Sequence, residues 1–395
     1  MEFEETLSQA VGRGASDVHL KPRAHPILRI HGALELQQDW DVITQDYMLD
    51  LAKRLLKPQR LTALLEDGKE QDLAYTVKNT GRFRVNLFLA KGEVHASLRA
   101  IPHKIPAFEE LHLPKVLEKL AMDRRGMILV TGVTGSGKST TLAAMVDYMN
   151  RYRNDHIITI EDPIEFIHED KTCVVDQREV GQDTRSFAQA LRAALREDPD
   201  VILVGEMRDA ETMSVALHAA ETGHLVLSTL HTLNATETVN RLIGTFPPHQ
   251  EDQIRAQLSG VMQGIISQRL VIKAGGKGRV PAVEVMVATG VIRDSIRDQE
   301  KTPQIPVTIA AGQSQYGMQT FDQSLLALYR DDMISLETAM EAATNPDDFA
   351  LKIRGIFSAA EMTWEVGSEE PGKPGARPVP GAPPAGGPTF FKKDK

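Results

Sequence analysis

Apolar residues in the first hundred positions alternate between helical and strand-like spacing. A helical pattern opens the chain at 3–11, and a longer one covers 45–66. Shorter apolar stretches typical of strands lie at 18–20, 27–30, 72–77, 82–89 and 94–101. The last two are joined by a Lys-Gly turn and predict a hairpin. We therefore predict a small α/β domain over residues 1–101, followed by a proline-punctuated linker over 102–114.

From residue 115 the pattern changes to strand, loop and helix, repeated several times. Strands are predicted at 127–131, 156–160, 201–204 and 225–229, and helices near 138–150, 184–197 and 209–221. This alternation predicts a parallel sheet with helices on both faces and ligands at the carboxyl ends of the strands. Beyond 234 the pattern is mostly helical to about 362. We predict a second domain over 115–363 and a disordered Gly/Pro-rich tail over 364–395.

Composition narrows the classes of protein. The 395 residues carry a formal net charge of −9 and a single cysteine, Cys173. The acidic balance argues against binding to nucleic acid. One cysteine allows neither an internal disulfide nor a cysteine-cluster zinc site. No apolar run reaches the roughly 18 residues of a membrane span, and the acidic N-terminus lacks the signal-peptide pattern. These features favour the cytoplasm.

The strongest chemical signal is the sequence Gly-Val-Thr-Gly-Ser-Gly-Lys-Ser between a predicted strand and a predicted helix. It fits the phosphate-binding loop, in which glycines let backbone N–H groups surround phosphate oxygens. We expect Lys138 to meet the β- and γ-phosphates, and to face solvent before nucleotide binds. We expect the Ser139 hydroxyl to bind Mg²⁺. The predicted ATP-binding residues are Gly132, Val133, Thr134, Gly135, Ser136, Gly137, Lys138, Ser139 and Thr140.

Two further apolar strands end in carboxylates. One delivers Glu161 and Asp162, where a carboxylate can hold the waters of Mg²⁺ or polarise an attacking water. A solvated turn is the alternative for these two residues. The other strand is similar to a Walker B strand in which Gly205 replaces the usual aspartate, so we expect Glu206 to orient the nucleophilic water. The following Arg208-Asp209 is expected to form structural pairs.

Two histidines bracket the next apolar strand. His224 and His231 are seven positions apart. That odd offset places them on opposite sides of an extended strand, so they cannot readily share one metal. His231 follows the strand and is a candidate donor to the γ-phosphate, with a satisfied structural histidine as the alternative.

In this order the segments resemble one family, the secretion-type hexameric ATPases that drive type II secretion and type IV pili. Residues 161–165 are similar to the family's aspartate box, Gly205-Glu206 to its atypical Walker B, and 224–231 to its histidine box. The resemblance covers about residues 1–363. It implies an N-terminal PAS-like domain, a C-terminal RecA-like P-loop domain with a helical C-terminal part, and a ring of six chains.

The resemblance also gives a role to two arginines of the N-terminal domain. Arg84 and Arg99 match the positions from which family members reach the nucleotide phosphates. They lie on neighbouring strands of the predicted hairpin, which can present two cations on one face. Without the resemblance, both would be ordinary cations on a strand face.

Residues 291–298 are similar to the Ala-Ile-Arg-Asn-Leu-Ile-Arg-Glu motif of the family's retraction branch, with Ser295 in place of an apolar residue. A helix there would place Ile292 and Ile296 on one face. Residues 317–323 also resemble this branch, including its accessory paralogue.

The leading hypothesis is a homohexameric ATPase that powers type IV pilus retraction at the cytoplasmic face of the bacterial inner membrane. The implied partners are the inner-membrane platform protein of the pilus and a paralogous retraction ATPase. The alternatives are an accessory, assembly or secretion ATPase of the same superfamily, or a regulatory nucleotide-binding subunit with little turnover. The absence of an Asn-Lys-x-Asp motif disfavours a GTPase, and the acidic balance disfavours a DNA motor.

Overall fold

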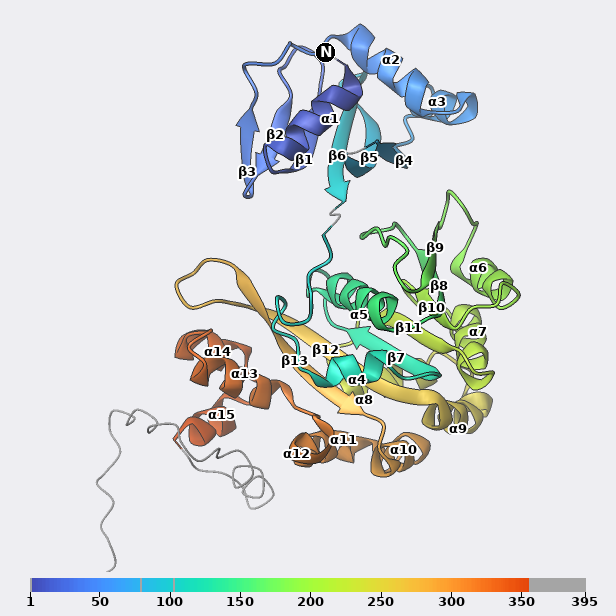
Figure 1. Ribbon diagram of the computed structural model, residues 1–395, viewed down its shortest axis with the longest axis vertical. Coiled ribbons are helices and arrows are strands. Elements are labelled where there is room, and N and C mark those ends of the chain that lie inside the picture. The colour runs from blue at the N-terminus through green and yellow to red at the C-terminus, as the bar shows by residue number, and fades with distance from the viewer. Residues whose placement is uncertain (1, 79, 102–103, 355–395) are drawn as a thin grey trace, which may run out of the picture.

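The computed structural model describes residues 2–78, 80–101 and 104–354. It contains two β-sheets, one above the other along the long axis of the molecule (Figure 1). The α/β class predicted from the sequence is confirmed. The predicted disordered tail, and the last residues of the predicted second domain, lie outside the described residues.

The N-terminal sheet has six strands in the order β3-β2-β1-β6-β5-β4, and all neighbouring pairs are antiparallel. The strands are β1 (Ala15–Leu20), β2 (Ile27–Ile30), β3 (Ala33–Leu36), β4 (Gln71–Val77), β5 (Gly81–Ala90) and β6 (Glu93–Ile101). The predicted hairpin is confirmed as β5 and β6. Its turn residues Lys91 and Gly92 both have positive φ, the conformation that a tight two-residue hairpin needs.

Three helices pack against this sheet: α1 (Phe3–Gly12), α2 (Gln45–Leu55) and α3 (Pro58–Leu65). The single helical stretch predicted from the pattern is therefore two helices. Lys57 has an extended backbone (φ −65°, ψ 152°) because the ring of the following Pro58 disfavours the helical conformation there. Pro58 then opens α3 at a position where a missing N–H is tolerated. The helix predicted at the start of the chain is confirmed, with Phe3 and Leu7 buried against the sheet.

The C-terminal sheet has seven strands in the order β13-β12-β7-β11-β10-β8-β9, and every neighbouring pair is parallel except β12 and β13. The strands are β7 (Gly126–Thr131), β8 (His156–Glu161), β9 (Val174–Glu179), β10 (Val201–Val204), β11 (Leu225–Leu230), β12 (Met262–Ile272) and β13 (Arg279–Val287). Its first helices are α4 (Val116–Ala121), α5 (Lys138–Tyr152), α6 (Phe187–Ala194), α7 (Ala210–Glu221), α8 (Ala235–Ile243) and α9 (Glu251–Val261). The strands and helices predicted over 127–221 are thus confirmed, with small shifts at their ends.

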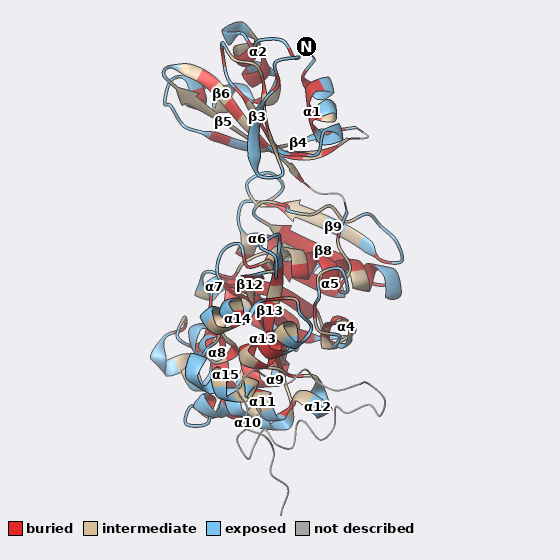
Figure 2. Ribbon diagram, turned by 90° about the vertical axis from the view of Figure 1, so that its left-hand side faces the viewer, coloured by how far each residue is buried: buried red, intermediate tan, exposed pale blue. Residues whose placement is uncertain are grey.

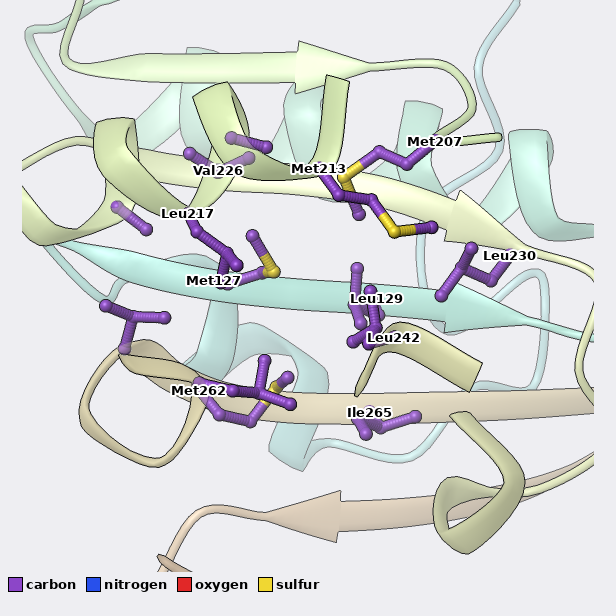
Figure 3. Packing of buried hydrophobic residues seen from close by; sticks show 14 of the residues in the cluster. Met127, Leu129, Met207, Met213, Leu217, Val226, Leu230, Leu242, Met262 and Ile265 are labelled. Carbon is purple, nitrogen blue, oxygen red and sulfur yellow. The ribbon is translucent and has the colours of Figure 1, made fainter. Parts of the chain in front are cut away.

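Helices cover both faces of this sheet, and its central strands β7, β8, β10 and β11 are almost entirely buried (Figure 2). Alternate residues of β7 enter two different cores. Met127 and Leu129 pack with Leu217 of α7 and Leu242 of α8 (Figure 3), whereas Ile128 packs on the side of α4 and α5. Truncating a core leucine of this kind costs roughly 2–5 kcal/mol. The sheet is therefore a rigid frame for the loops at its strand ends.

The expectation of mostly helix beyond residue 234 is wrong for β12 and β13. Most of β12 is buried between its neighbours, so its apolar residues do not alternate with polar ones. A continuous apolar run does not distinguish a strand from a helix. No pattern predicts β9 either, because this edge strand is largely polar.

The remaining described chain is helical, as predicted. Its helices are α10 (Gly290–Arg297), α11 (Ile305–Ala311), α12 (Gln313–Tyr316), α13 (Phe321–Arg330), α14 (Leu336–Ala342) and α15 (Pro346–Ile353). Across the part of the chain that the structure describes, no helix is both long enough and apolar enough to cross a bilayer. An ion pair joins the two sheets, with the Arg82 guanidinium of β5 lying 3.1 Å from the Glu179 carboxylate at the end of β9.

Candidate nucleotide-binding and catalytic site

The phosphate-binding loop joins β7 to α5. Gly132 leaves the strand with φ 140°, and a Cβ at this position would lie 2.5 Å from the carbonyl oxygen of Gln268. Gly137 precedes the helix with φ 94°, a left-handed conformation that glycine adopts without strain. These two glycines let the chain curl around the start of α5. The N–H groups of the first helical turn are available there to bind phosphate.

Lys138 folds back onto this loop. Its Nζ donates to the carbonyl oxygens of Gly132, at 2.9 Å, and Val133, at 3.1 Å, and only 8% of the residue is exposed. The expectation that Lys138 faces solvent is therefore wrong, because carbonyls of the loop itself satisfy the ammonium group. Burial lowers the pKa of Lys138, and the charges of Glu206 and Glu165 oppose that shift.

A cavity of about 190 Å³ opens beside the loop, at the carboxyl ends of the central strands. It brings together Lys138, Ser139, Glu161, Glu206 and His231, which sequence analysis assigned to one site. The complete lining is Thr134, Gly135, Lys138, Ser139, Leu142, Ala143, Glu161, Asp162, Pro163, Glu165, Phe166, His168, Phe187, Leu203, Gly205, Glu206, Thr229 and His231.

These residues fit a nucleotide phosphate with Mg²⁺. The Ser139 hydroxyl and the carboxylates of Glu161, Asp162 and Glu206 all line the cavity, and oxygen ligands of this kind are those that Mg²⁺ prefers. The ammonium group of Lys138 lies in the same space. The cavity can therefore accommodate Mg²⁺ beside the phosphate groups of a nucleotide.

The backbone before Glu206 explains why glycine stands where a Walker B strand usually has aspartate. A Cβ on Gly205 would lie 3.2 Å from the carbonyl oxygen of Ile160 and 3.3 Å from the Cα of Glu161. Any side chain there would press on the strand that delivers Glu161. The Thr229 hydroxyl also donates to the Gly205 carbonyl at 2.7 Å, which fixes the direction in which the chain leaves β10.

The Glu206 carboxylate is held by two side chains. Its Oε2 lies 2.7 Å from a guanidinium nitrogen of Arg208, and its Oε1 lies 3.2 Å from Nε2 of His231. The hydrogen bond from Arg208 lowers the pKa of Glu206, which keeps the carboxylate charged. The expected structural role holds for Asp209, which accepts the N–H of Thr212 at the start of α7. Arg208 also forms a pair, with Glu206, and it does not line the cavity.

Glu161 is held inside the site rather than in a solvated turn. Its Oε1 accepts hydrogen bonds from the Thr159 hydroxyl at 2.7 Å and from the Gln177 amide at 3.1 Å. Burial raises the pKa of Glu161, and these two donors oppose that shift. The carboxylate is therefore a strongly desolvated base whose charge depends on its hydrogen bonds.

The histidines occupy different environments. His224 precedes β11 and its Nδ1 lies 2.9 Å from the carbonyl oxygen of Ala219, whereas His231 follows β11 and meets Glu206. A third histidine, His168, lines the cavity although no sequence pattern marks it. Burial lowers the pKa of His168 to about 4, so it is neutral at physiological pH.

A second cavity of about 190 Å³ lies on the other flank of the loop. The Oγ of Ser136 and the Oε1 of Gln268 are buried there without a hydrogen-bond partner among the described residues, so this space has unused polar capacity. Its lining is Glu110, Leu111, His112, Leu113, Ser136, Gly137, Thr140, Thr141, Gln268, Leu270, Lys273, Arg279 and Pro281. No local sequence pattern marks this cavity, because most of its lining residues come from β12, β13 and the linker.

Comparison with known proteins identifies the family. The sequence model described as "Type II/IV secretion system protein" matches residues 2–294, well over half of the chain. The chain belongs to this family. It is 45% identical over 357 residues to the type IV pilus retraction ATPase PilT of Pseudomonas aeruginosa, a match that covers 88% of this chain and 100% of that protein. It is 40% identical over 354 residues to the type IV pilus ATPase PilU of the same organism, covering 90% and 92%.

A solved structure shows the same relationship. The crystal structure of the pilus retraction motor PilT with bound ADP has a TM-score of 0.80 and 47% identity to this family member, covering 88% of this chain and 98% of that one. The resemblance predicted from the sequence motifs is confirmed.

The two arginines that the family resemblance singled out lie directly opposite each other on β5 and β6. In the described chain each pairs with a carboxylate of its own sheet. Arg99 Nε lies 2.8 Å from Asp17, and Arg84 Nε lies 3.7 Å from Asp72. Neither lines the cavity beside Lys138. Arg84 does line an adjoining cavity of about 200 Å³, and both cavities are bordered by Asp162.

The segment similar to the retraction motif forms α10. Ile292 and Ile296 are fully buried on one face, as the pattern predicts. Ser295 is also buried, and its hydroxyl donates to the carbonyl oxygen of Val291 at 2.9 Å. A serine is therefore accommodated where the motif has an apolar residue. Arg293 donates to the carbonyl oxygen of Ser259 at 2.6 Å, which ties α10 to the end of α9.

Proposed function

We propose that this protein is an ATPase motor that powers the retraction of type IV pili. The observation that carries the proposal is a single cavity that unites Lys138, Ser139 and Glu206. These residues supply a phosphate-binding cation, a hydroxyl for Mg²⁺ and a charged base. The relative at 45% identity is named as a pilus retraction ATPase, and it matches over its full length.

The geometry supports a defined division of labour. ATP phosphates bind the loop N–H groups, and the Lys138 ammonium exchanges the carbonyl oxygens of Gly132 and Val133 for phosphate oxygens. Ser139 holds Mg²⁺, which neutralises charge on the phosphates. Glu206 accepts the proton of the attacking water, and His231, which shares the Glu206 carboxylate, responds to the γ-phosphate. Glu161 contributes a second negative charge from the facing wall.

The base and ribose of the nucleotide occupy the second cavity on the other flank of the loop. Thr140 and Thr141 of α5 border it, so a nucleotide whose phosphates lie in the loop can extend into it. The unpaired Ser136 and Gln268 oxygens supply acceptors there for a ribose hydroxyl or an amino group.

Six chains form the working ring, with Arg84 and Arg99 acting on the phosphates from the N-terminal domain. Support comes from their register and exposure: they are directly opposite each other, and their side chains are 48% and 71% exposed. ATP binding draws an N-terminal domain toward a nucleotide, and product release lets the two part. That cycle converts hydrolysis into motion.

The motor acts at the cytoplasmic face of the bacterial inner membrane, on the platform protein of the pilus. A paralogous retraction ATPase is a further partner. The match to PilU at 40% identity keeps an accessory motor as the second candidate function.

Deletion of the gene tests the biological role. Loss of twitching motility with an excess of surface pili is expected for a retraction motor. Cells without pili would instead indicate an assembly ATPase. ATP turnover by the purified chain, with and without the paralogue, separates a motor from a regulatory subunit with little turnover.

A further inference from the structure

A side chain outside the cavity holds one of its carboxylates in place. Strand β9 runs parallel to β8 at the edge of the sheet, and Gln177 of β9 lies opposite Thr159 of β8. Gln177 is half-buried and is not among the residues that line the cavity. Its side-chain hydrogen bonds run to Glu161 and to the segment that follows Glu161.

Both the nitrogen and the oxygen of the Gln177 amide form hydrogen bonds. Its Nε2 donates to Glu161 Oε1 at 3.1 Å and to the carbonyl oxygen of Phe166 at 2.9 Å, and its Oε1 accepts the backbone N–H of His168 at 2.8 Å. A flipped amide would set its oxygen against a carboxylate and a carbonyl, so this network admits one orientation. Gln177 therefore ties Glu161 to the returning loop 166–168, which forms another part of the cavity wall.

Glu161 needs this support because few groups hold its side chain. The side-chain donors to it are the Gln177 amide and the Thr159 hydroxyl, which bind the same oxygen atom, Oε1. Its other oxygen, Oε2, lies 3.5 Å from the backbone nitrogen of Glu165. Removing either donor leaves a desolvated carboxylate with one fewer hydrogen bond and one more way to rotate.

We propose that Gln177 is a positioning residue for ATP hydrolysis, which acts by fixing the orientation of the Glu161 carboxylate in the cavity. This inference rests on the catalytic role proposed for Glu161. Gln177 does not line the cavity, so it acts through Glu161 and not on the nucleotide.

Gln177→Glu is the sharpest test, because it keeps the size of the side chain and an acceptor for the His168 N–H. It replaces the donor to Glu161 with a second negative charge. We expect kcat for ATP hydrolysis by the assembled full-length protein to fall about tenfold to a hundredfold, as for loss of a charge-assisted hydrogen bond of about 1.5–3 kcal/mol. KM for ATP should change little, whereas thermal stability should fall, because the new carboxylate faces the Glu161 carboxylate and the Phe166 carbonyl oxygen. Thr159→Val removes the other donor at nearly constant volume and should shift kcat in the same direction. Gln253→Glu on the exposed side of α9 is the control for added charge.

The double variant Glu161→Gln/Gln177→Glu separates positioning from a structural role. If Gln177 acts through Glu161, the double variant turns over at the rate of Glu161→Gln alone. Independent, additive losses would overturn the positioning role, and so would a wild-type kcat in Gln177→Glu beside an impaired Glu161→Gln. A wild-type kcat in Glu161→Gln would remove the role proposed for Glu161, and the inference with it, so the two failures are distinguishable.

Discussion

The nucleotide cavity and the face of the N-terminal sheet that carries Arg84 and Arg99 both hold charged groups, but they are built differently. In the cavity, Lys138 is buried and bonded to its own loop, and Glu206 is held between Arg208 and His231. On the N-terminal sheet, Arg84 and Arg99 are exposed and rest on Asp72 and Asp17. The cavity groups contact one another within a single folded chain, whereas the two arginines lie on the surface.

This difference indicates which charged groups are positioned within one chain and which depend on domain movement or assembly. The groups proposed to bind phosphate and activate water are positioned by the parallel sheet within one chain. The arginines do not line the cavity that holds these groups, and Arg84 lines the adjoining one. A domain movement or a neighbouring chain would have to bring them to the phosphates. Their carboxylate partners keep two adjacent cations compatible with a stable sheet until then. Chemistry is thus prearranged, whereas the cations that would complete it depend on assembly.

The largest expected effect is in the nucleotide cavity. Lys138→Ala should reduce ATP turnover by at least about 10³-fold, the scale on which one cation acts on a transferred phosphoryl group. The protein should remain folded, because the variant removes a desolvated charge together with its two carbonyl contacts. ATP hydrolysis and circular dichroism of the same preparation measure this, with exposed Lys119→Ala as the control. Near wild-type turnover would show that the cavity is not the active site.

Glu206→Gln should lower kcat by roughly 10²–10⁴-fold, the range for loss of a general base, while ATP still binds. The amide keeps the volume and one acceptor for Arg208 but cannot take a proton from water. Nucleotide binding and turnover are measured side by side, with exposed Glu211→Gln as the control. An equal loss of binding and turnover would make Glu206 a structural residue.

Arg84→Ala and Arg99→Ala test the exposed arginines of the N-terminal sheet. Each should lower turnover of the assembled ring at least about tenfold, a share of the effect of an arginine finger, with little change in thermal stability. Arg23→Ala is a matched control, since Arg23 is an exposed arginine of the same domain and is also paired with a carboxylate, Glu93. Unchanged turnover in both variants would show that the two arginines form surface ion pairs without a role in hydrolysis.

The smallest expected effect is on the pH dependence of stability, through a buried carboxylate near the nucleotide cavity. Glu284 of β13 is 7% exposed and accepts the N–H of Ala235 at 2.8 Å, at the start of the helix that follows His231. Burial raises the pKa of Glu284 from 4.5 to about 7. The folded protein therefore binds this proton more tightly than the unfolded chain. The free energy of unfolding should fall as pH rises from about 4.5 to about 7, by up to about 3 kcal/mol from this group.

Glu284→Gln keeps the acceptor for Ala235 and carries no charge. It should be more stable than the wild type at pH 8 and similar to it at pH 5, as measured by thermal unfolding across that range. The exposed Glu341→Gln should follow the wild-type curve. Parallel curves for wild type and Glu284→Gln would show that Glu284 stays charged in the folded protein.

Sequence patterns located the chemistry because each piece of it is local. The glycines around Lys138 match a loop whose geometry depends on a few adjacent residues, and an apolar strand that ends in a carboxylate predicts where Glu161 and Glu206 will lie. Alternating strands and helices were equally visible, since period and length are properties of short segments. The β12 and β13 strands were not, because a strand buried between neighbours lacks the alternation that marks it.

What the sequence by itself determined is therefore the P-loop, the order of the carboxylates and histidines, the α/β class and the family. Tertiary structure alone decided how these parts meet. It set Arg84 opposite Arg99, brought His231 to Glu206 and brought Gln177 to Glu161. Each of these contacts depends on strand register or on the space left by neighbouring segments. Such relations arise only when distant parts of the chain pack together, so no local pattern encodes them.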